Sequence, residues 1–345
     1  MADDATVLVT GGSGYIGAWC VIGLLRRGYR VRTTIRDLKR ESAVRAMIAR
    51  EIEPGDRLSL AAAELTSDTG WDAAADGCTY VLHVASPLPP RTPRDANELI
   101  VPAREGARRA LRAAAAAGVR RVVLTSSIAA IAYGHRRPPP QPMTEALWSD
   151  PTNPETTPYA QSKTLAERAA WDFINDHGGA MTLATINPVV VIGPVLGRDY
   201  SFSIQVVERL LTGNPPGLPR LGFSLVDVRD VADLHIAAMT AEAAAGQRFI
   251  ASNRFLWFAE MAEILRQRLG PAASRVPRRM LPDWLLRLVG LMDPQVRSVL
   301  GDLGRRREVT ADKAKDVLGW TPRPVEDSLV DCAQSLIKHG AVRGA

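Results

Sequence analysis

Short runs of apolar and β-branched residues alternate with longer amphipathic segments over the first 190 residues of the chain. The short runs, which predict buried strands, lie at residues 6–10, 31–35, 57–62, 80–85, 121–127 and 181–186. The longer segments predict helices over residues 15–27, 41–50 and 97–118. Continuous apolar strands separated by helices indicate a parallel sheet covered on both faces. With right-handed crossovers, the sequence therefore predicts an α/β fold with a doubly wound parallel sheet.

The regular alternation ends in the second half of the chain. Residues 136–158 contain seven prolines and predict an irregular surface segment. After Asn187 the pattern is mixed, with a Gly/Pro-rich stretch at 213–222, a predicted strand at 225–230 and several closing helices. We expect a smaller, mixed C-terminal lobe that is partly threaded back into the first domain. The expected boundaries are 1–187 plus about 225–250 for the first domain, and about 188–224 and 251–345 for the lobe.

The composition is that of an ordinary globular protein, with 46% hydrophobic and 23% charged residues among 345. The net charge of +6 comes mostly from scattered arginines, which favours a solvated surface over a nucleic-acid interface. The opening residues MADDA are acidic, unlike those of a signal peptide. The apolar stretch 280–292 is interrupted by Asp283 and Arg287, so we do not expect it to span a membrane. We expect a cytoplasmic protein without nucleic-acid or membrane partners.

Cysteine and histidine are few and show no metal-binding pattern. The three cysteines lie far apart, which indicates buried thiols in a reducing compartment rather than disulfides: Cys20, Cys78 and Cys332. Three histidines have spacings that match no zinc site, so we expect core or surface roles for them: His83, His135 and His235. No metal is expected.

The first predicted strand runs into the glycine-rich segment TGGSGYIG at residues 10–17, which precedes a predicted helix. Gly11, Gly14 and Gly17 lie three residues apart, and Gly12, Gly14 and Gly17 satisfy the spacing G-x-G-x-x-G. Between a strand and a helix, this spacing is typical of the dinucleotide-binding turn of a Rossmann fold. Glycine lets the backbone approach a pyrophosphate closely, and the helix N-terminus offers amides to it. We therefore expect a dinucleotide-binding first domain and a substrate-binding C-terminal lobe.

The residue after the second predicted strand indicates which dinucleotide is bound. NAD-selective sites place a carboxylate at the tip of this strand, where it binds the ribose 2′-hydroxyl. Here the tip is Ile35 and Arg36 follows it, so a guanidinium is available for the 2′-phosphate of NADP(H). Lys39 or Arg40 could assist. Asp37 comes two positions late and would repel a phosphate, so we expect its side chain to face outward.

The segment YAQSK places Tyr159 and Lys163 four residues apart, on one face of a predicted helix. A lysine ammonium close to a phenol favours the phenolate, which makes a tyrosine effective in proton transfer. Ser127 ends the segment TSS at the C-terminal end of a predicted strand, where doubly wound sheets bind their ligands. A serine hydroxyl there could polarise a substrate carbonyl. Ser127, Tyr159 and Lys163 are the expected catalytic residues.

These residues resemble the extended short-chain dehydrogenase/reductases, and more narrowly the dihydroflavonol-reductase-like branch. The resemblance covers most of the chain and rests on an ordered series of segments. They are TGGSGYIG, TTIRD, LHVASP, VPAREG, RVVLTSS, TEALWSD, YAQSKTLAERAAW, NPVVVIGP, VDVRDVADLH and KAKDVLGWTPRPVEDSL. The resemblance implies NADPH-dependent reduction of a ketone or aldehyde, with hydride from the nicotinamide and a proton from Tyr159.

The resemblance also implies individual roles. Ser127 is expected to hydrogen-bond the carbonyl oxygen, and Lys163 to assist Tyr159 and bind the nicotinamide ribose. The expected residues of the NADP(H) site are Gly11, Gly14, Tyr15, Ile16, Gly17, Arg36, Lys39, Glu64, Leu65, Val84, Ala85, Ser86, Thr125, Tyr159, Lys163, Pro188 and Val190.

Three positions depart from the patterns of the family. Glu64 stands where the family has an aspartate beside the adenine. Ala132 stands where the plant flavonoid enzymes carry an asparagine that holds the flavonoid ring. The cinnamoyl-CoA branch has an NWYCY-type sequence around its tyrosine, and this chain has TTPYAQ at residues 156–161. A smaller or more apolar ketone or aldehyde is therefore the expected substrate.

Other interpretations of the same motifs remain open. A nucleotide-sugar epimerase or dehydratase shares the Ser/Tyr/Lys set but retains NAD and usually has an acidic residue where Arg36 stands. A non-catalytic NADPH-binding module would tend to lose the tyrosine, which is present here as Tyr159. The apolar stripe of the helix at 97–118 fits core packing, with a homodimer interface as the alternative.

Overall fold

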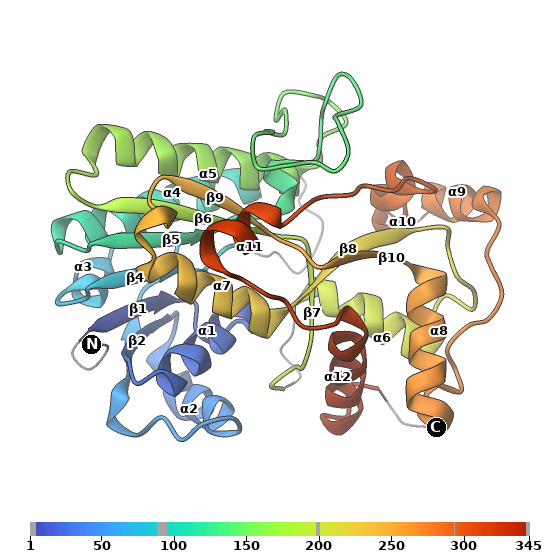
Figure 1. Ribbon diagram of the computed structural model, residues 1–345, viewed down its shortest axis with the longest axis horizontal. Helices are drawn as coiled ribbons and strands as arrows, with labels where there is room; N and C mark the ends of the chain where they lie inside the picture. Colours follow the sequence, from blue (N-terminus) through green and yellow to red (C-terminus); the bar gives the residue numbers. More distant parts are fainter. Residues whose placement is uncertain (1–4, 88–94, 198–200, 293, 343–345) are drawn as a thin grey trace. The chain divides into compact units, whose positions relative to one another are not determined.

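The computed structural model describes residues 5–87, 95–197, 201–292 and 294–342, which form two compact units. The first unit combines three separate stretches of chain, Met1–Pro188, Arg229–Ala251 and Thr310–Thr321. The second unit consists of Val189–Val228, Ser252–Val309 and Pro322–Ala345. Figure 1 traces these stretches by colour along the chain.

The first unit is built on a parallel sheet that has seven strands within the described residues, in the order β3-β2-β1-β4-β5-β6-β9. Their bounds are β1 (Thr6–Thr10), β2 (Arg30–Ile35), β3 (Leu58–Ala62), β4 (Tyr80–His83), β5 (Arg121–Thr125), β6 (Thr182–Pro188) and β9 (Gln247–Ala251). The central strands are apolar along their whole length because both faces of the sheet are covered; Val7, Val9, Val122 and Val123 are fully buried. The predicted doubly wound α/β fold is confirmed.

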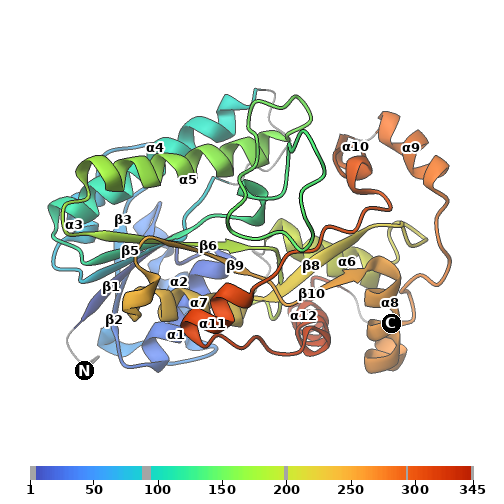
Figure 2. The same cartoon turned by 45° about the horizontal axis from the view of Figure 1, so that its top comes forward.

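Helices cover both faces of this sheet. Figures 1 and 2 show α4 and α5 side by side over one face, while α1, α2 and α7 lie over the other. The bounds of the helices in this unit are α1 (Tyr15–Arg26), α2 (Glu41–Ala49), α3 (Trp71–Ala75), α4 (Asn97–Ala116), α5 (Pro158–His177), α7 (Val228–Thr240) and α11 (Asp312–Leu318). On the face of α4, the core joins Trp71, Leu111 and Ala114 to strand residues such as Leu183. Residues 131–157 lie outside the helices and strands.

The second unit has a mixed three-stranded sheet, described here by itself, in the order β10-β8-β7. β7 is parallel to β8, and β10 is antiparallel to β8. Its strands are β7 (Val190–Ile192), β8 (Gly222–Asp227) and β10 (Arg254–Trp257). Its helices are α6 (Gln205–Thr212), α8 (Phe258–Leu269), α9 (Asp283–Met292), α10 (Pro294–Val299) and α12 (Val325–Lys338). Throughout the described residues, helices that are both long and apolar enough to cross a bilayer are absent.

Two boundaries differ from the expectation. The predicted strand at 225–230 ends at Asp227, and α7 begins at Val228, with Asp230 in its first turn where a carboxylate favours the helix. Residues 310–321, expected in the C-terminal lobe, group with the first unit. They are held there by hydrogen bonds from the Thr310 N–H to the Met143 carbonyl and from the Trp320 indole to the Asp230 carbonyl.

The turn between β1 and α1 depends on close backbone packing. Gly11 has φ +72°, a conformation that favours glycine. At Gly17, a Cβ atom would lie 2.3 Å from the carbonyl oxygen of Gly11, so the helix could not keep its approach to the strand. We predict that Gly17→Ala lowers the free energy of unfolding by about 1–3 kcal/mol, measured by urea denaturation.

The matched control is Gly23→Ala in the same helix. A Cβ atom there would lie 3.0 Å from the terminal methyl group of Ile236, a flexible side-chain end that can move. Because alanine also favours the helix, this variant should lose little or no stability. Equal losses at both positions would show that the close contact with Gly11 is not the cause.

Candidate active site

The carboxyl ends of the parallel strands meet at one edge of the sheet in the first unit. The strand register pairs Thr10 with His83, His83 with Leu124, and Thr125 with Ile186. The chain reverses its direction of strand addition between β1 and β4, and at such a point an open α/β sheet leaves a crevice for ligands. The segments that follow these strands carry most of the residues expected in the site.

The glycine-rich turn lies at this edge. The N–H of Gly11 donates to Thr34 Oγ1 at 3.0 Å, and the N–H of Gly14 donates to the Gly11 carbonyl at 2.9 Å. Gly14 is the residue that precedes α1, so Tyr15, Ile16 and Gly17 form its first helical turn. N–H groups in a first turn have no helical carbonyl to bind. The turn therefore presents a glycine-lined surface and a helix N-terminus on the same side.

Arg36 follows the end of β2 and is exposed. Neither Arg36 nor Lys39 has a side-chain hydrogen bond or ion pair to any residue in the described part of the chain. The Asp37 carboxylate accepts a hydrogen bond from the Lys39 N–H at 2.9 Å and so begins a short 3-10 helix, Leu38–Arg40. Asp37 is thus used by the local turn, and the two basic side chains beside it remain available for a ligand.

The segment after β4 lies directly beside the glycine-rich turn. The Ala85 N–H donates to Thr10 Oγ1 at 3.0 Å, and a Cβ atom added to Gly11 would lie 3.1 Å from Ala85. Val84 and Ala85 are half-buried and Ser86 is exposed. The same Thr10 hydroxyl forms a hydrogen bond with His83 Nδ1, 2.9 Å away.

Ser127 lies two residues beyond the end of β5 and is held by its own backbone neighbours. Its Oγ accepts a hydrogen bond from the Ala129 N–H at 3.1 Å, at the start of a short 3-10 helix, Ile128–Ala130. The peptide N–H occupies the oxygen as an acceptor, so the serine proton remains free to be donated. Ser127 can therefore donate a hydrogen bond to a carbonyl oxygen bound at this edge.

Tyr159 and Lys163 lie in the first turns of α5, which Thr157 caps by accepting the Ala160 N–H. Tyr159 is 41% exposed, whereas Lys163 is buried. Lys163 Nζ donates to the Thr125 carbonyl oxygen at 3.4 Å. This hydrogen bond joins the helix that carries the tyrosine to the strand end that carries the serine, so the three expected catalytic residues lie in one region of the first unit.

Two buried histidines near the strand ends, His83 and His235, have lowered pKa values. Burial, together with the positive charge of Lys163, lowers the pKa of His83 to about 3. Burial lowers the pKa of His235 to about 4, against the opposing effect of its hydrogen bond to the Val231 carbonyl. Since that carbonyl can only accept, His235 Nδ1 carries the proton and Nε2 accepts from Thr125 Oγ1 at 2.7 Å. Both imidazoles are therefore neutral at pH 7.

The other residues expected in the NADP(H) site are divided between the two units. The Glu64 side chain is exposed and accepts from Thr66, and Leu65 packs against Gly106 of α4. Pro188 ends β6 at the same sheet edge as Thr125. Val190 lies on β7 in the second unit. Groups of three or more His, Cys, Asp or Glu side chains suited to a metal ion are absent among the residues that the structure describes.

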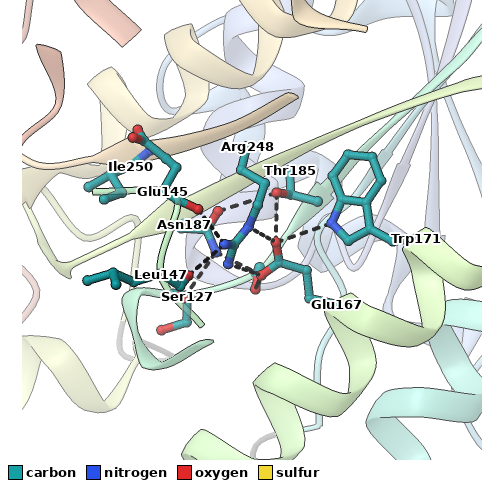
Figure 3. Close-up of polar contacts among 10 residues, drawn as sticks. Ser127, Glu145, Leu147, Glu167, Trp171, Thr185, Asn187, Arg248 and Ile250 are labelled. Carbon is teal, nitrogen blue, oxygen red and sulfur yellow. Dashed lines mark hydrogen bonds and ion pairs between the residues drawn. The ribbon is translucent and has the colours of Figure 1, made fainter. Parts of the chain in front are cut away.

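A buried polar network that the sequence motifs did not predict lies behind the serine (Figure 3). The Glu167 carboxylate, fully buried on α5, pairs with Arg248 of β9 at 2.7 Å and binds Asn187 of β6. An available signal was Arg248 itself, which begins the otherwise apolar run RFIA, because arginine is seldom buried in a strand without a partner.

Comparison with known proteins identifies relatives over nearly the whole chain. The model of the NAD dependent epimerase/dehydratase family matches residues 7–251. The chain is 38% identical to cinnamoyl-CoA reductase 1 of Arabidopsis thaliana, over 97% of this chain and 90% of that protein. It is 35% identical to dihydroflavonol 4-reductase of Zea mays, over 77% of this chain and 75% of that protein.

Solved structures share the fold. Yeast methylglyoxal/isovaleraldehyde reductase complexed with NADPH superposes with a TM-score of 0.79 at 23% identity, over 97% of this chain and 99% of that chain. Vestitone reductase from alfalfa superposes with a TM-score of 0.75 at 25% identity, over 98% of this chain and 99% of that chain.

The neutral buried histidines predict a pH-dependent stability. In the unfolded chain histidine binds a proton near pH 6.5, whereas folded His235 does so only near pH 4. Acidification from pH 7.5 to 5 therefore protonates the unfolded state first and lowers the free energy of unfolding, by roughly 2 kcal/mol for this residue. Urea denaturation at several pH values measures the slope.

Two variants test whether His235 causes the change of the free energy of unfolding with pH. His235→Asn should show a smaller loss of stability between pH 7.5 and 5 than the unmodified protein. His177→Asn, at an exposed position on α5, is the control and should keep the full pH dependence. The assignment is wrong if His235→Asn keeps the full slope as well.

Proposed function

Because the chain belongs to the NAD dependent epimerase/dehydratase family, we propose that it reduces a ketone or aldehyde to an alcohol with NADPH, through Ser127, Tyr159 and Lys163. The resemblance to the extended short-chain dehydrogenase/reductases stated above is confirmed by this family and by the reductases among its relatives. The observation that carries the proposal is the hydrogen bond from Lys163 Nζ to the Thr125 carbonyl, which brings the Tyr/Lys helix to the strand end that precedes Ser127.

The glycine-rich turn fits a dinucleotide. A Cβ atom would lie 2.3 Å from the Gly11 carbonyl oxygen at Gly17 and 2.0 Å from Thr33 Oγ1 at Gly12, so the close packing of the turn requires glycine at both positions. The first turn of α1, which is twelve residues long, offers N–H groups and the positive end of the helix dipole to the pyrophosphate. Arg36 and Lys39, free of protein partners in the described chain, would hold the 2′-phosphate.

The proposed reaction uses three side chains in distinct roles. Bound NADPH supplies the hydride. Tyr159 donates its phenolic proton to the substrate oxygen, and Ser127 donates a hydrogen bond to the same oxygen, so negative charge does not accumulate there. The Lys163 ammonium stabilises the phenolate that Tyr159 becomes. Its two N–H groups that do not face Thr125 are available for the nicotinamide ribose.

We further propose that the substrate is smaller or more apolar than a flavonoid. Position 132 holds a buried alanine, whose methyl group offers no hydrogen bond to a polyhydroxylated ring. The curated relatives include a cinnamoyl-CoA reductase and a dihydroflavonol 4-reductase. A spectrophotometric panel of aliphatic and aromatic aldehydes and ketones, with cinnamoyl-CoA and a dihydroflavonol included, tests this. Turnover confined to the last two compounds would contradict the substrate proposal and leave carbonyl reduction intact.

Removal of the phenolic hydroxyl tests the reaction. Tyr159→Phe should lower kcat about 10²–10⁴-fold, because the proton donor is lost, and should leave the Kd for NADPH unchanged. NADPH oxidation, followed by the absorbance of the reduced nicotinamide, gives kcat, and cofactor fluorescence gives the Kd.

The matched control is Tyr80→Phe, which removes a hydroxyl from the first residue of β4, at the opposite edge of the sheet. This variant should retain full activity. Undiminished turnover in Tyr159→Phe would refute the assignment of the proton donor.

Arg36→Ala tests the cofactor. The loss of a charge-assisted hydrogen bond to a phosphate should raise the Kd for NADPH roughly 10–150-fold and change that for NADH little. Arg30→Ala, at the other end of β2 and also exposed, should change neither. Equal losses for both cofactors in Arg36→Ala would contradict the 2′-phosphate role. NAD that copurifies tightly with the protein would favour an epimerase or dehydratase instead.

A further inference from the structure

The buried carboxylate of Glu167 connects four elements of the first unit. It lies on α5, one turn after Lys163, and has no exposed surface. Figure 3 shows it surrounded by side chains from β6 and β9 and by Trp171 of its own helix. Arg248 Nε donates to Oε1 at 2.7 Å, and Arg248 Nη1 donates to the carbonyl oxygens of Glu145 and Leu147. Both charges are thus neutralised and hydrogen-bonded inside the protein.

One hydrogen-bond route runs from this carboxylate to the backbone of Ser127, and a second hydrogen bond holds the side chain of the preceding residue, Ser126. Asn187 Nδ2 donates to Glu167 Oε2 at 2.8 Å and to the Ser127 carbonyl oxygen at 3.2 Å, so the amide bridges the two residues. Ser126 Oγ donates to Glu167 Oε2 at 2.5 Å. Both partners of Asn187 Nδ2 are acceptors, so the amide nitrogen must face them, while Thr185 Oγ1 donates to Glu167 Oε1 at 2.9 Å. The carboxylate therefore holds the Ser126 side chain directly and the Ser127 carbonyl through Asn187.

The backbone conformation of Ser127, held by these hydrogen bonds, determines where its side-chain hydroxyl lies. Ser127 is extended, with φ −164° and ψ 156°, which ends the strand and turns the chain into the 3-10 helix. In this conformation its carbonyl accepts the Ala130 N–H at 2.9 Å in addition to Asn187, and its Oγ accepts the Ala129 N–H. A rotation of the Ser127 peptide would break these contacts and move the hydroxyl away from its position.

A buried ion pair is poorly explained by stability alone. Taking two charges out of water costs several kcal/mol per ion, and well-packed apolar residues often stabilise a core as well. The ion pair instead fixes the positions of its neighbours, because a buried carboxylate with several donors is satisfied in only one arrangement of those donors. Here those neighbours are the strand end that carries Ser127 and the helix that carries Tyr159 and Lys163.

We propose that Glu167 and Asn187 are positioning residues that fix the Ser127 hydroxyl relative to Tyr159 and Lys163. They act through the backbone of Ser127 and do not contact the substrate. The inference rests on the proposed function, since it requires Ser127 to take part in the reaction. Its consequence is that loss of the Asn187 amide should slow the chemical step and leave cofactor binding intact.

A double-mutant cycle between Asn187 and Ser127 tests the proposal. Asn187→Ala in the unmodified protein should lower kcat on the order of 10–100-fold, as misplacement of a catalytic group does, with KM for NADPH unchanged. In the Ser127→Ala background the same substitution should have little further effect, because the group that it positions is gone. A purely structural role would lower kcat by the same factor in both backgrounds, and that result would overturn the proposal.

Two measurements and two further variants make the cycle decisive. The Kd for NADPH and the thermal midpoint of each variant report whether it is folded under assay conditions. Trp171→Phe removes a different donor to the same carboxylate, at 3.4 Å, and should leave kcat unchanged, because the Trp171 side chain has no hydrogen bond to Asn187 or Ser127 among the residues that the structure describes. Ser126→Ala, which removes only one hydroxyl, replaces Asn187→Ala in the cycle if the latter does not fold. It should likewise lower kcat only where Ser127 is present.

The outcomes separate this proposal from the proposed function. Full activity in Ser127→Ala would show that the serine has no catalytic role, and the proposed reaction would fail together with this inference. A large loss in Ser127→Ala, combined with unchanged kcat in both Asn187→Ala and Ser126→Ala, would leave the reaction intact and overturn only the positioning role.

Discussion

The requirement that a buried charge be fully paired shapes the catalytic edge of the first unit. Glu167 has no exposed surface, and its carboxylate binds groups from α5, the end of β5, β6 and β9. In the described chain, every buried side-chain nitrogen or oxygen atom has a hydrogen-bond partner. A carboxylate in that position destabilises the protein unless its donors are in place, so the elements that supply them are drawn to one point. Ser127 lies directly beside that point.

The proposed cofactor-binding residues and the proposed reactive residues lie at different strands of this edge. Near β1 and β2 the backbone of the glycine-rich turn is not covered by side chains, which leaves room for a dinucleotide. Arg36, at the end of β2, is exposed to solvent. Near β5 and β6 the side chains matter most: Ser127 and Lys163 are buried and hydrogen-bonded, whereas Tyr159 is partly exposed. The turn that would receive a dinucleotide is open, and two of the three groups proposed to act on a carbonyl are held by hydrogen bonds inside the protein.

Local motifs in the sequence predicted the sheet and most of the edge, because strand periodicity and glycine spacing depend on neighbouring residues. The strand at residues 6–10 and the start of α1 at Tyr15 agree with the structure. The interval from Glu167 to Arg248 is 81 residues, and no local pattern connects them. For the same reason residues 310–321 were assigned to the wrong unit, since their contacts with Met143 and Asp230 depend on distant partners.

The order in which the chain is synthesised has a consequence for this edge. Arg248 leaves the ribosome about 4–16 s after Glu167, at the usual rate of elongation over 81 residues. Until then the carboxylate lacks its guanidinium and has to stay hydrated, so the space behind Ser127 cannot close. The nascent protein can therefore form its glycine-rich turn early, but the polar network behind Ser127 is completed only after β9 has been added to the sheet.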